Sequence, residues 1–412
     1  MTEVIEKTEY KKGYKKTKLG WIPEDWEVKK LGDFGNFKNG ISKGGENFGF
    51  GTPIIGLNDV FGKFYIKEKN LNFLVNASKQ ELIDFNLNKG DVLFVRSSVK
   101  PEGVGLPCVI ESNLEKTTFS GFLIRFRDTK GILNDKYKRY CFLLEYFRHR
   151  LLSKSTISAN TNINQPSLAS LNMIVPSLKE QEKIAEILSA WDDGIEILEK
   201  LIEQKEILKN SLAQKCFQRK NNLFQLKPYK LGELFTNRKE TNCCDLELLS
   251  VCDGLGIIPR SQLNAKDNSN EDKSKYLKVC IGDLAYNTMR MWQGRCGVSS
   301  YEGIVSPAYT VCIPKNNIDV DYMYYLFKTP HMIHDFWRYS QGIVDDTLNL
   351  KFNNFEVIKI WIPDKETQTK IAKLLKSYDE EIQLLNSKLE KLKEQKKGLM
   401  QKLLTGQIRV KV

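Results

Sequence analysis

The chain has 412 residues, of which 63 are lysine or arginine and 51 are aspartate or glutamate, so its formal charge is +12. Apolar residues make up 41% and aromatic residues 10%, enough to form hydrophobic cores, which argues against wholesale disorder. The length predicts two to four domains. The sequence contains no run of about 18 apolar residues, the length that crosses a membrane. The lysine-rich N-terminus has none of the apolar stretch of a secretory signal.

Cysteine and histidine give no sign of a cross-linked or metal-binding protein. The chain has 9 cysteines, an odd number, and no Cys-x-x-Cys pair. We therefore expect free thiols in a reducing cytoplasm rather than a disulfide framework. Among the 3 histidines, His331 and His334 are spaced to share one helix face. Because zinc usually takes four ligands, we predict no metal site.

The most informative feature is an internal repeat. The segment from Pro176 to Lys215 aligns with the segment from Pro363 to Lys402 at an offset of 187 residues. At this offset identical residues follow Gln181, Lys183, Ile184, Ala185, Leu188, Asp192, Ile195, Leu198, Glu203, Lys209, Leu212, Gln214 and Lys215. A weaker echo precedes each segment, because Lys30-Leu-Gly resembles Lys230-Leu-Gly. The chain therefore alternates two variable segments with two copies of one helical segment.

Both helical segments have the apolar rhythm of a coiled coil. In the second copy the seam positions are Ile371, Leu375, Tyr378, Ile382, Leu385, Leu389, Leu392, Leu399 and Leu403. In the first copy they are Ile184, Leu188, Trp191, Ile195, Leu198 and Ile202. Lys205 and Lys209 continue this seam, so we expect looser or re-registered packing there. The alternative is two amphipathic core helices of a globular domain, although such helices usually span only about 10–14 residues.

The segments outside these helices have a mixed α/β pattern. In the first, 91–96 and 121–126 are strand-like and 137–149 has a helical apolar face. In the second, 282–286 and 308–312 are strand-like and a helix is expected from about 321 to 337. The expected boundaries are 1–17 for a basic N-terminal segment, 18–175 and 221–362 for two domains, and 176–220 and 363–412 for two long helices.

The sequence offers no catalytic motif. It lacks the GxxxxGK[ST] phosphate loop, GxGxxG, HExxH and the GxSxG nucleophile elbow. It also lacks the Asn/Asp-Pro-Pro-aromatic motif of amino-methyltransferases. Asp364 and Glu366 follow Pro363 and resemble a nuclease cluster only faintly. They stand at a helix start, where the helix dipole favours acidic residues, so we assign no catalytic residue.

Several stretches together resemble a known family. These are Lys18–Trp26 followed by Lys30-Leu-Gly, then Pro176–Ala185 at the entry of the first long helix, and finally Met289–Gly294 and Gly303–Tyr309. From about Lys18 to Val412 the chain resembles the specificity (S) subunit of type I restriction–modification enzymes, the HsdS family. It departs from exact internal symmetry where Thr367 replaces Glu180.

The resemblance implies an α+β fold with two similar mixed α/β target-recognition domains. They are separated by two long helices that form an antiparallel coiled coil, with a pseudo-two-fold internal repeat. It also implies a non-catalytic subunit that reads a split site in double-stranded DNA, one half-site per domain, and docks two methyltransferase (M) subunits and restriction (R) subunits. S-adenosylmethionine would bind the M subunits, which methylate adenine N6, and ATP and Mg the R subunits. This chain would need no cofactor and no membrane.

Two other functions compete with this interpretation. The chain could be a stand-alone DNA-modifying enzyme, which the missing motifs argue against. It could also be a structural coiled-coil protein without DNA specificity, in which case the charge of +12 would reflect only general basicity. A basic protein favours an anionic partner such as nucleic acid.

Candidate DNA contacts are basic and amide side chains in loops that follow strands. In the first domain they are Arg96, Ser97, Ser98 and Lys100, together with Asn162, Asn164 and Gln165 of a second polar loop. In the second domain they are Asn287, Thr288, Arg290, Gln293, Arg295 and Gln341. We expect Trp292, within the same stretch, to pack against the protein rather than stack on a base.

Overall fold

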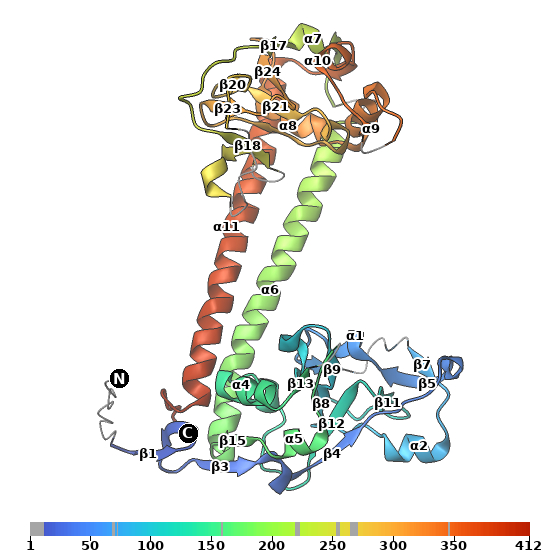
Figure 1. Cartoon of the computed structure of the whole chain (residues 1–412), viewed down its shortest axis with the longest axis vertical. Coiled ribbons are helices and arrows are strands. Elements are labelled where there is room, and N and C mark those ends of the chain that lie inside the picture. The colour runs from blue at the N-terminus through green and yellow to red at the C-terminus, as the bar shows by residue number, and fades with distance from the viewer. Residues whose placement is uncertain are drawn as a thin grey trace. The chain divides into compact units, whose positions relative to one another are not determined.

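The computed structural model describes residues 12–67, 71, 73–157, 160–218, 223–252, 256–263, 271–344 and 347–412. The chain divides into two compact units. Unit 1 contains Met1–Ile197 and Leu389–Val412, and unit 2 contains Leu198–Lys388. Two long helices, α6 (Leu178–Cys216) and α11 (Lys365–Leu404), each contribute one stretch to both units (Figure 1).

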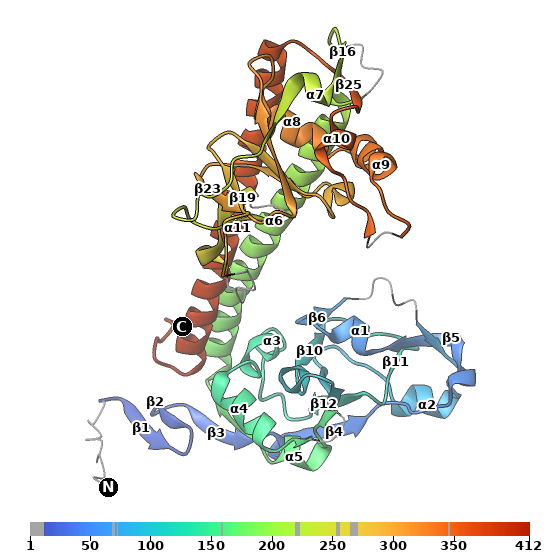
Figure 2. The same ribbon diagram turned by 45° about the horizontal axis from the view of Figure 1, so that its top comes forward.

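Unit 1 is built around a five-stranded sheet in the order β4-β12-β8-β10-β6 (Figure 2). These strands are Gly35–Asn39, Leu123–Asp128, Val92–Val95, Pro107–Ile110 and Tyr65–Ile66. All four residues of the central strand β8 are buried, as expected for a strand covered on both faces. The other strands of the unit are β1 (Tyr14–Thr17), β2 (Gly20–Pro23), β3 (Glu27–Lys30), β5 (Phe48–Ile55), β7 (Leu74–Val75), β9 (Ser97–Ser98), β11 (Thr118–Phe119), β13 (Thr156–Ile157), β14 (Thr161–Asn162) and β15 (Asn172–Val175). Its short helices are α1 (Leu57–Val60), α2 (Lys79–Asp84), α3 (Lys138–Cys141), α4 (Glu145–Ser153) and α5 (Gln165–Ala169).

Unit 2 has a four-stranded sheet in the order β17-β24-β21-β22. These strands are Phe235–Arg238, Tyr309–Pro314, Leu284–Asn287 and Cys296–Val298. Its other strands are β16 (Lys227–Lys230), β18 (Leu249–Cys252), β19 (Gly256–Pro259), β20 (Leu277–Val279), β23 (Gly303–Val305) and β25 (Lys359–Ile362). Its short helices are α7 (Leu231–Leu234), α8 (Val320–Phe327), α9 (Pro330–Tyr339) and α10 (Phe352–Phe355).

The two units repeat one topology. The order β4-β12-β8-β10 of unit 1 matches β17-β24-β21-β22 of unit 2, and all these pairs are antiparallel. In each unit an antiparallel strand pair, β3 with β15 or β16 with β25, leads into the long helix that follows. The prediction of two similar mixed α/β domains separated by long helices is confirmed.

The helix predicted at each domain end is wrong in one respect, because two helices replace one. Leu144 interrupts the first with ψ 135°, between α3 and α4. Thr329 interrupts the second with ψ 147°, just before Pro330 at the start of α9. A proline disfavours the helical conformation of the residue before it, which explains the second break.

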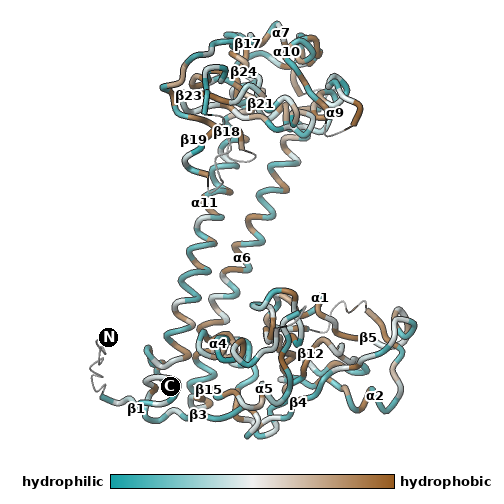
Figure 3. The backbone as a smooth tube through the Cα atoms, viewed as in Figure 1, coloured by the Kyte–Doolittle hydropathy of each residue, from teal (hydrophilic) through white to brown (hydrophobic). Residues whose placement is uncertain are grey.

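The long helices keep the predicted heptad seam along their whole length. Every predicted seam position of α6 and α11 is buried or half-buried, and both helices alternate between hydrophilic and hydrophobic residues (Figure 3). Within unit 1, Ile184, Ala185 and Leu188 of α6 join the same core as Met400 and Leu403 of α11. Each fully buried leucine or isoleucine contributes about 1.5–3 kcal/mol.

The expected disturbance at Lys205 and Lys209 is absent. Lys205 Nζ lies 2.8 Å from Glu381 Oε1 of α11, and Lys209 pairs with Asp379. Because the α6 number rises while the α11 number falls, the helices are antiparallel here. The lysines keep the seam register since carboxylates of the opposite helix neutralise them, which sequence periodicity alone does not reveal.

Both ends of the chain close unit 1. Tyr14 of the N-terminal hairpin β1–β2 donates from its hydroxyl to the carbonyl of Gly406 (2.7 Å). Arg409 donates to Glu180 Oε1 (2.8 Å) and to both carboxylate oxygens of Asp25 (3.0 and 2.8 Å). Trp26 Nε1 donates to the other oxygen of the buried Glu180 (2.9 Å). Thr367 stands at the equivalent helix position of unit 2 and makes a local bond to Asp364 instead. No helix of the described residues combines the length and apolar character that a membrane span requires.

Candidate nucleic-acid interface

The two polar stretches of unit 1 lie side by side. Strand β9 pairs with β14, so that Ser98 faces Thr161 and Ser97 faces Asn162. The backbone nitrogen of Ile163 donates to the carbonyl of Arg96 (3.0 Å). Residues that are about 65 positions apart in the sequence thus form one small polar sheet at the end of the central strand β8.

The side chains of this sheet differ in how far the protein itself occupies them. Arg96 is half-buried and its guanidinium donates to the carbonyl of Gly121 (3.2 Å). The amide of Asn162 donates to the carbonyl of Asn160 (2.9 Å). Ser97 and Ser98 are half-buried, whereas Lys100 is exposed at the start of the following turn. Lys100 is therefore the most accessible of the predicted contacts on this strand and turn.

Asn164 and Gln165 have structural partners. Asn164 caps helix α5, because its side-chain oxygen accepts from the nitrogen of Ser167 (2.8 Å). Gln165, with its amide nitrogen turned toward strand β4, donates to the carbonyl of Phe37 (2.9 Å) and accepts from the nitrogen of Asn39 (3.1 Å). Both residues border an open hollow of about 450 Å³ beside β4. Their amides chiefly shape this surface.

In unit 2 the predicted contacts lie in the turn between β21 and β22. Buried Met291 anchors the turn, and Gly294 ends it with φ +73°, a conformation that favours glycine. Arg290, Gln293 and Arg295 are exposed in this turn. The turn is fixed in shape and presents two cationic side chains and one amide to solvent.

Three neighbours of these residues hold the turn together. Asn287 accepts from the nitrogen of Met289 (2.9 Å) and Thr288 donates from its hydroxyl to the carbonyl of Ala308 (2.9 Å). Trp292 is half-buried and its indole nitrogen donates to the carbonyl of Met289 (3.0 Å). This contact agrees with the packing role expected for Trp292.

The structure also adds a residue that the sequence analysis missed. Gln341 and Asn349 exchange two backbone hydrogen bonds (3.0 and 2.8 Å). Leu350 then donates to the carbonyl of Thr288 (2.8 Å), as Ile163 does to Arg96 in unit 1. Asn349 therefore occupies the position of Asn162 and follows it by 187 residues. The repeat offset of the long helices already contained this signal.

A buried ion pair supports each central sheet. Asp91 accepts from Arg127 (2.7 and 2.6 Å) and Asp283 accepts from Arg238 (2.7 and 3.1 Å). The hydrogen bond to Asp283 raises the pKa of the Arg238 guanidinium. Each aspartate follows a glycine with φ +85°, which explains the repeated Gly-Asp sequence. These arginines are engaged inside the protein.

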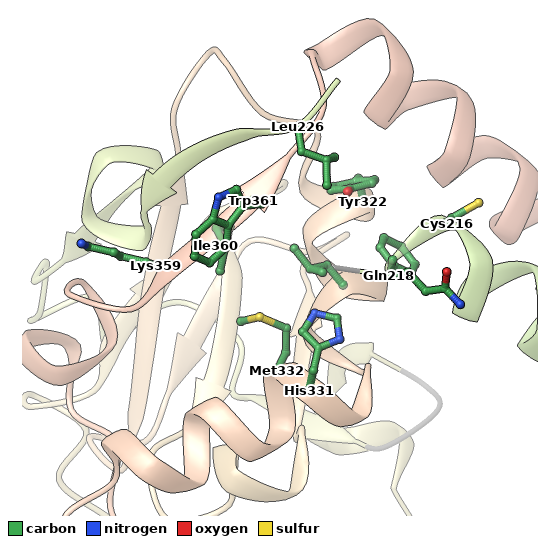
Figure 4. Close-up of a pocket in the computed structure, with 11 residues that line it drawn as sticks. Cys216, Gln218, Leu226, Tyr322, His331, Met332, Lys359, Ile360 and Trp361 are labelled. Carbon is green, nitrogen blue, oxygen red and sulfur yellow. The ribbon is translucent and has the colours of Figure 1, made fainter. Parts of the chain in front are cut away.

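The histidines predicted to have surface or packing roles lie on α9. His331 borders a small hollow together with Met332, Tyr322 and Trp361 (Figure 4). The ring of His334 lies 5.9 Å from that of Trp337. Across the described ranges, no three side chains of histidine, cysteine, aspartate or glutamate gather as potential metal ligands.

A family model described as the type I restriction modification DNA specificity domain matches residues 23–206 and again residues 227–394. The chain belongs to this family. It is 26% identical to the MjaX specificity subunit of Methanocaldococcus jannaschii, covering 97% of both chains. It is 22% identical to the type I restriction enzyme MjaVIII specificity subunit of the same organism, covering 95% of this chain and 94% of that one.

A solved structure shares the fold of the specificity family. The S subunit of a type I restriction-modification system from M. genitalium aligns with a TM-score of 0.55 at 17% identity, covering 92% of this chain and 96% of that one. The family resemblance inferred from the sequence is thus confirmed. The specificity domain occurs twice in the chain, and each copy carries one of the two polar surfaces described above.

Proposed function

We propose that this chain is the non-catalytic DNA-reading subunit of a type I restriction–modification complex, and that each specificity domain reads one half of a split sequence in double-stranded DNA. The observation that carries the proposal is the matched pairing at the two polar surfaces. A hairpin strand donates to the end of the central sheet strand at Arg96 in one unit and at Thr288 in the other. One scaffold therefore displays two different sets of side chains.

The two surfaces suit different half-sites. In unit 1 the exposed turn carries Lys100 beside Asn162, and in unit 2 it carries Arg290, Gln293 and Arg295. Arginine and lysine bind phosphates and guanine, whereas asparagine and glutamine suit adenine. Because the turns differ while the framework repeats, we expect a recognition sequence that is split and not palindromic.

The chemistry belongs to partner subunits in this proposal. M subunits, two per complex, would bind S-adenosylmethionine and methylate adenine N6, and R subunits would use ATP and Mg to translocate and cut DNA. Support for docking comes from apolar side chains that the long helices leave exposed, namely Ile197, Leu201, Leu208 and Leu384. Large exposed apolar positions often mark protein interfaces. We place the complex in the cytoplasm of a bacterium or archaeon.

The deciding experiment is to co-express the chain with its M subunit and to map methylated adenines across the genome. A single split motif with a fixed gap is the expected result. Methylation without a shared motif, or methylation by the purified chain alone with S-adenosylmethionine, would contradict the proposal.

The candidate contacts are tested by fluorescence anisotropy of the assembled complex on the mapped site. We expect Arg290→Ala to weaken binding about 5- to 100-fold, the range of one base contact, with an unchanged melting curve. Arg96→Ala should weaken binding less, since its guanidinium already bonds Gly121. The matched control is Lys227→Ala, an exposed cation on β16 outside the turn. Equal affinity of Arg290→Ala and the control would remove Arg290 from the interface.

A further inference from the structure

Each unit contains a cluster of one tyrosine, one aspartate and one lysine. In unit 1 the hydroxyl of Tyr140 donates to Asp192 Oδ2 (2.7 Å), and Lys396 pairs with Asp192 Oδ1. In unit 2 the hydroxyl of Tyr325 donates to Asp379 Oδ2 (2.6 Å), and Lys209 pairs with Asp379 Oδ1. The two clusters use the same atoms in the same order.

The clusters follow the internal repeat. The two aspartates are 187 residues apart, as are the two lysines. In each unit the tyrosine comes from a short domain helix, α3 or α8, and the aspartate from the long helix that follows the domain. The lysine comes from the opposite long helix. Each cluster therefore joins three elements, one domain helix and both long helices.

The lysines also lie over the tyrosine rings. Lys396 Nζ is 5.4 Å from the ring centre of Tyr140, and Lys209 Nζ is 5.8 Å from that of Tyr325. Burial raises the pKa of both tyrosine hydroxyls, so each keeps its proton at neutral pH and can donate. An ordinary seam ion pair such as Lys205 with Glu381 joins helix to helix only.

We propose that these two clusters are positioning residues that fix the orientation of each specificity domain on the helix pair, and through it the gap between half-sites that the complex accepts. The inference rests on the proposed reading of a split site. An apolar contact tolerates sliding and rotation, whereas a shared carboxylate with two directional partners allows one register. The gap is then set by the domain anchors as well as by helix length.

The two clusters are not equally enclosed. In unit 1 the side chain of Lys396 is 10% exposed and the Phe64 ring covers it at 5.1 Å. In unit 2 the side chain of Lys209 is 23% exposed and borders a hollow of about 1260 Å³ between α6, α11 and α8. We therefore expect the unit 1 anchor to be the stricter of the two.

The test uses the complex with its M subunit and duplexes whose half-sites are separated by the native gap or by one base pair more or less. Tyr140→Phe and Tyr325→Phe each remove one hydroxyl and leave the ion pair in place. We expect the ratio of native-gap to altered-gap affinity to fall at least about fivefold, the loss of a hydrogen bond to a charged group. Tyr324→Phe, the neighbouring tyrosine on α8, is the matched control and should keep the ratio.

Two results would overturn the inference. The first is an equal loss of affinity at every gap, which a merely structural role predicts. The second is a ratio unchanged from the Tyr324→Phe control. Hydrogen exchange of the full chain separates these failures from a failure of DNA reading. If no duplex shows a gap preference with the unaltered complex, the proposed function fails. Faster exchange in α3 or α8 of the variants would still identify the anchor.

Discussion

Replacing Gln181 by leucine should destabilise unit 1 strongly, because this buried amide joins the domain to the start of α6. Its side chain is fully buried. Nε2 donates to the carbonyls of Ile132 (3.0 Å) and Pro176 (2.9 Å), and Oε1 accepts from the nitrogen of Asn134 (2.8 Å). Leucine fills a similar volume but satisfies none of the three groups. Each buried group left without a partner costs about 1–3 kcal/mol, and part of that cost is recovered where water reaches it.

We therefore expect Gln181→Leu to lower the free energy of unfolding of unit 1 by about 3–5 kcal/mol. Gln368, which precedes the same turn of α11, makes two such bonds, to Pro363 (2.8 Å) and from Asp319 (3.0 Å). Gln368→Leu should cost unit 2 about 2–4 kcal/mol. These are large fractions of the roughly 5–15 kcal/mol that stabilises a domain.

The assay is urea unfolding read by hydrogen exchange of peptides from each unit, because one optical signal would merge two transitions. Gln204→Leu, at an exposed position of α6, is the control and should change stability by less than about 0.5 kcal/mol. A cost for Gln181→Leu below about 1 kcal/mol would refute the reasoning. So would a loss that falls on unit 2 instead.

Three further outcomes follow from the packing. Arg409 lowers the pKa of the Asp25 carboxyl by a hydrogen bond, so the stabilisation it gives is present at neutral pH and lost as the pH falls through that lowered value. Exchange in the N-terminal hairpin should accelerate below about pH 3, and in Arg409→Ala it should already be fast at neutral pH. Lys396→Met leaves a carboxylate unpaired and should cost about 3 kcal/mol in urea unfolding. A maleimide should label exposed Cys244 quickly and leave Cys108 unlabelled in the native protein, since burial raises the pKa of the Cys108 thiol to about 12; mass spectrometry of the labelled peptides checks this.

The long helices were predictable because one physical rule governs them. A residue of a coiled coil is buried or exposed according to its place in the heptad, so every seam position could be read from spacing alone. What spacing could not show is how Lys205 and Lys209 fit the seam. Their partners Glu381 and Asp379 belong to the other helix, and their pairing depends on the register between the helices.

The polar surfaces were predictable as regions, but the roles of their side chains were not. Residues after a strand end tend to be exposed and polar, which located the turn around Arg290. That Asn164 caps a helix and Asn287 fixes a turn depends on which backbone nitrogens lie nearby. Asn349 was missed because the repeat offset was applied to the helices and not to the strand that precedes them.

The closure of unit 1 by both chain ends has a consequence for synthesis. Unit 2 is continuous, from Leu198 to Lys388, whereas unit 1 lacks its last segment until Leu389–Val412 has left the ribosome. Glu180 waits for Arg409, which is 229 residues away in the chain. Domains fold as units during translation, so the second domain can be complete while the first still exposes an unfinished core. A chain truncated before residue 389 would keep unit 2 intact and leave unit 1 dependent on chaperones.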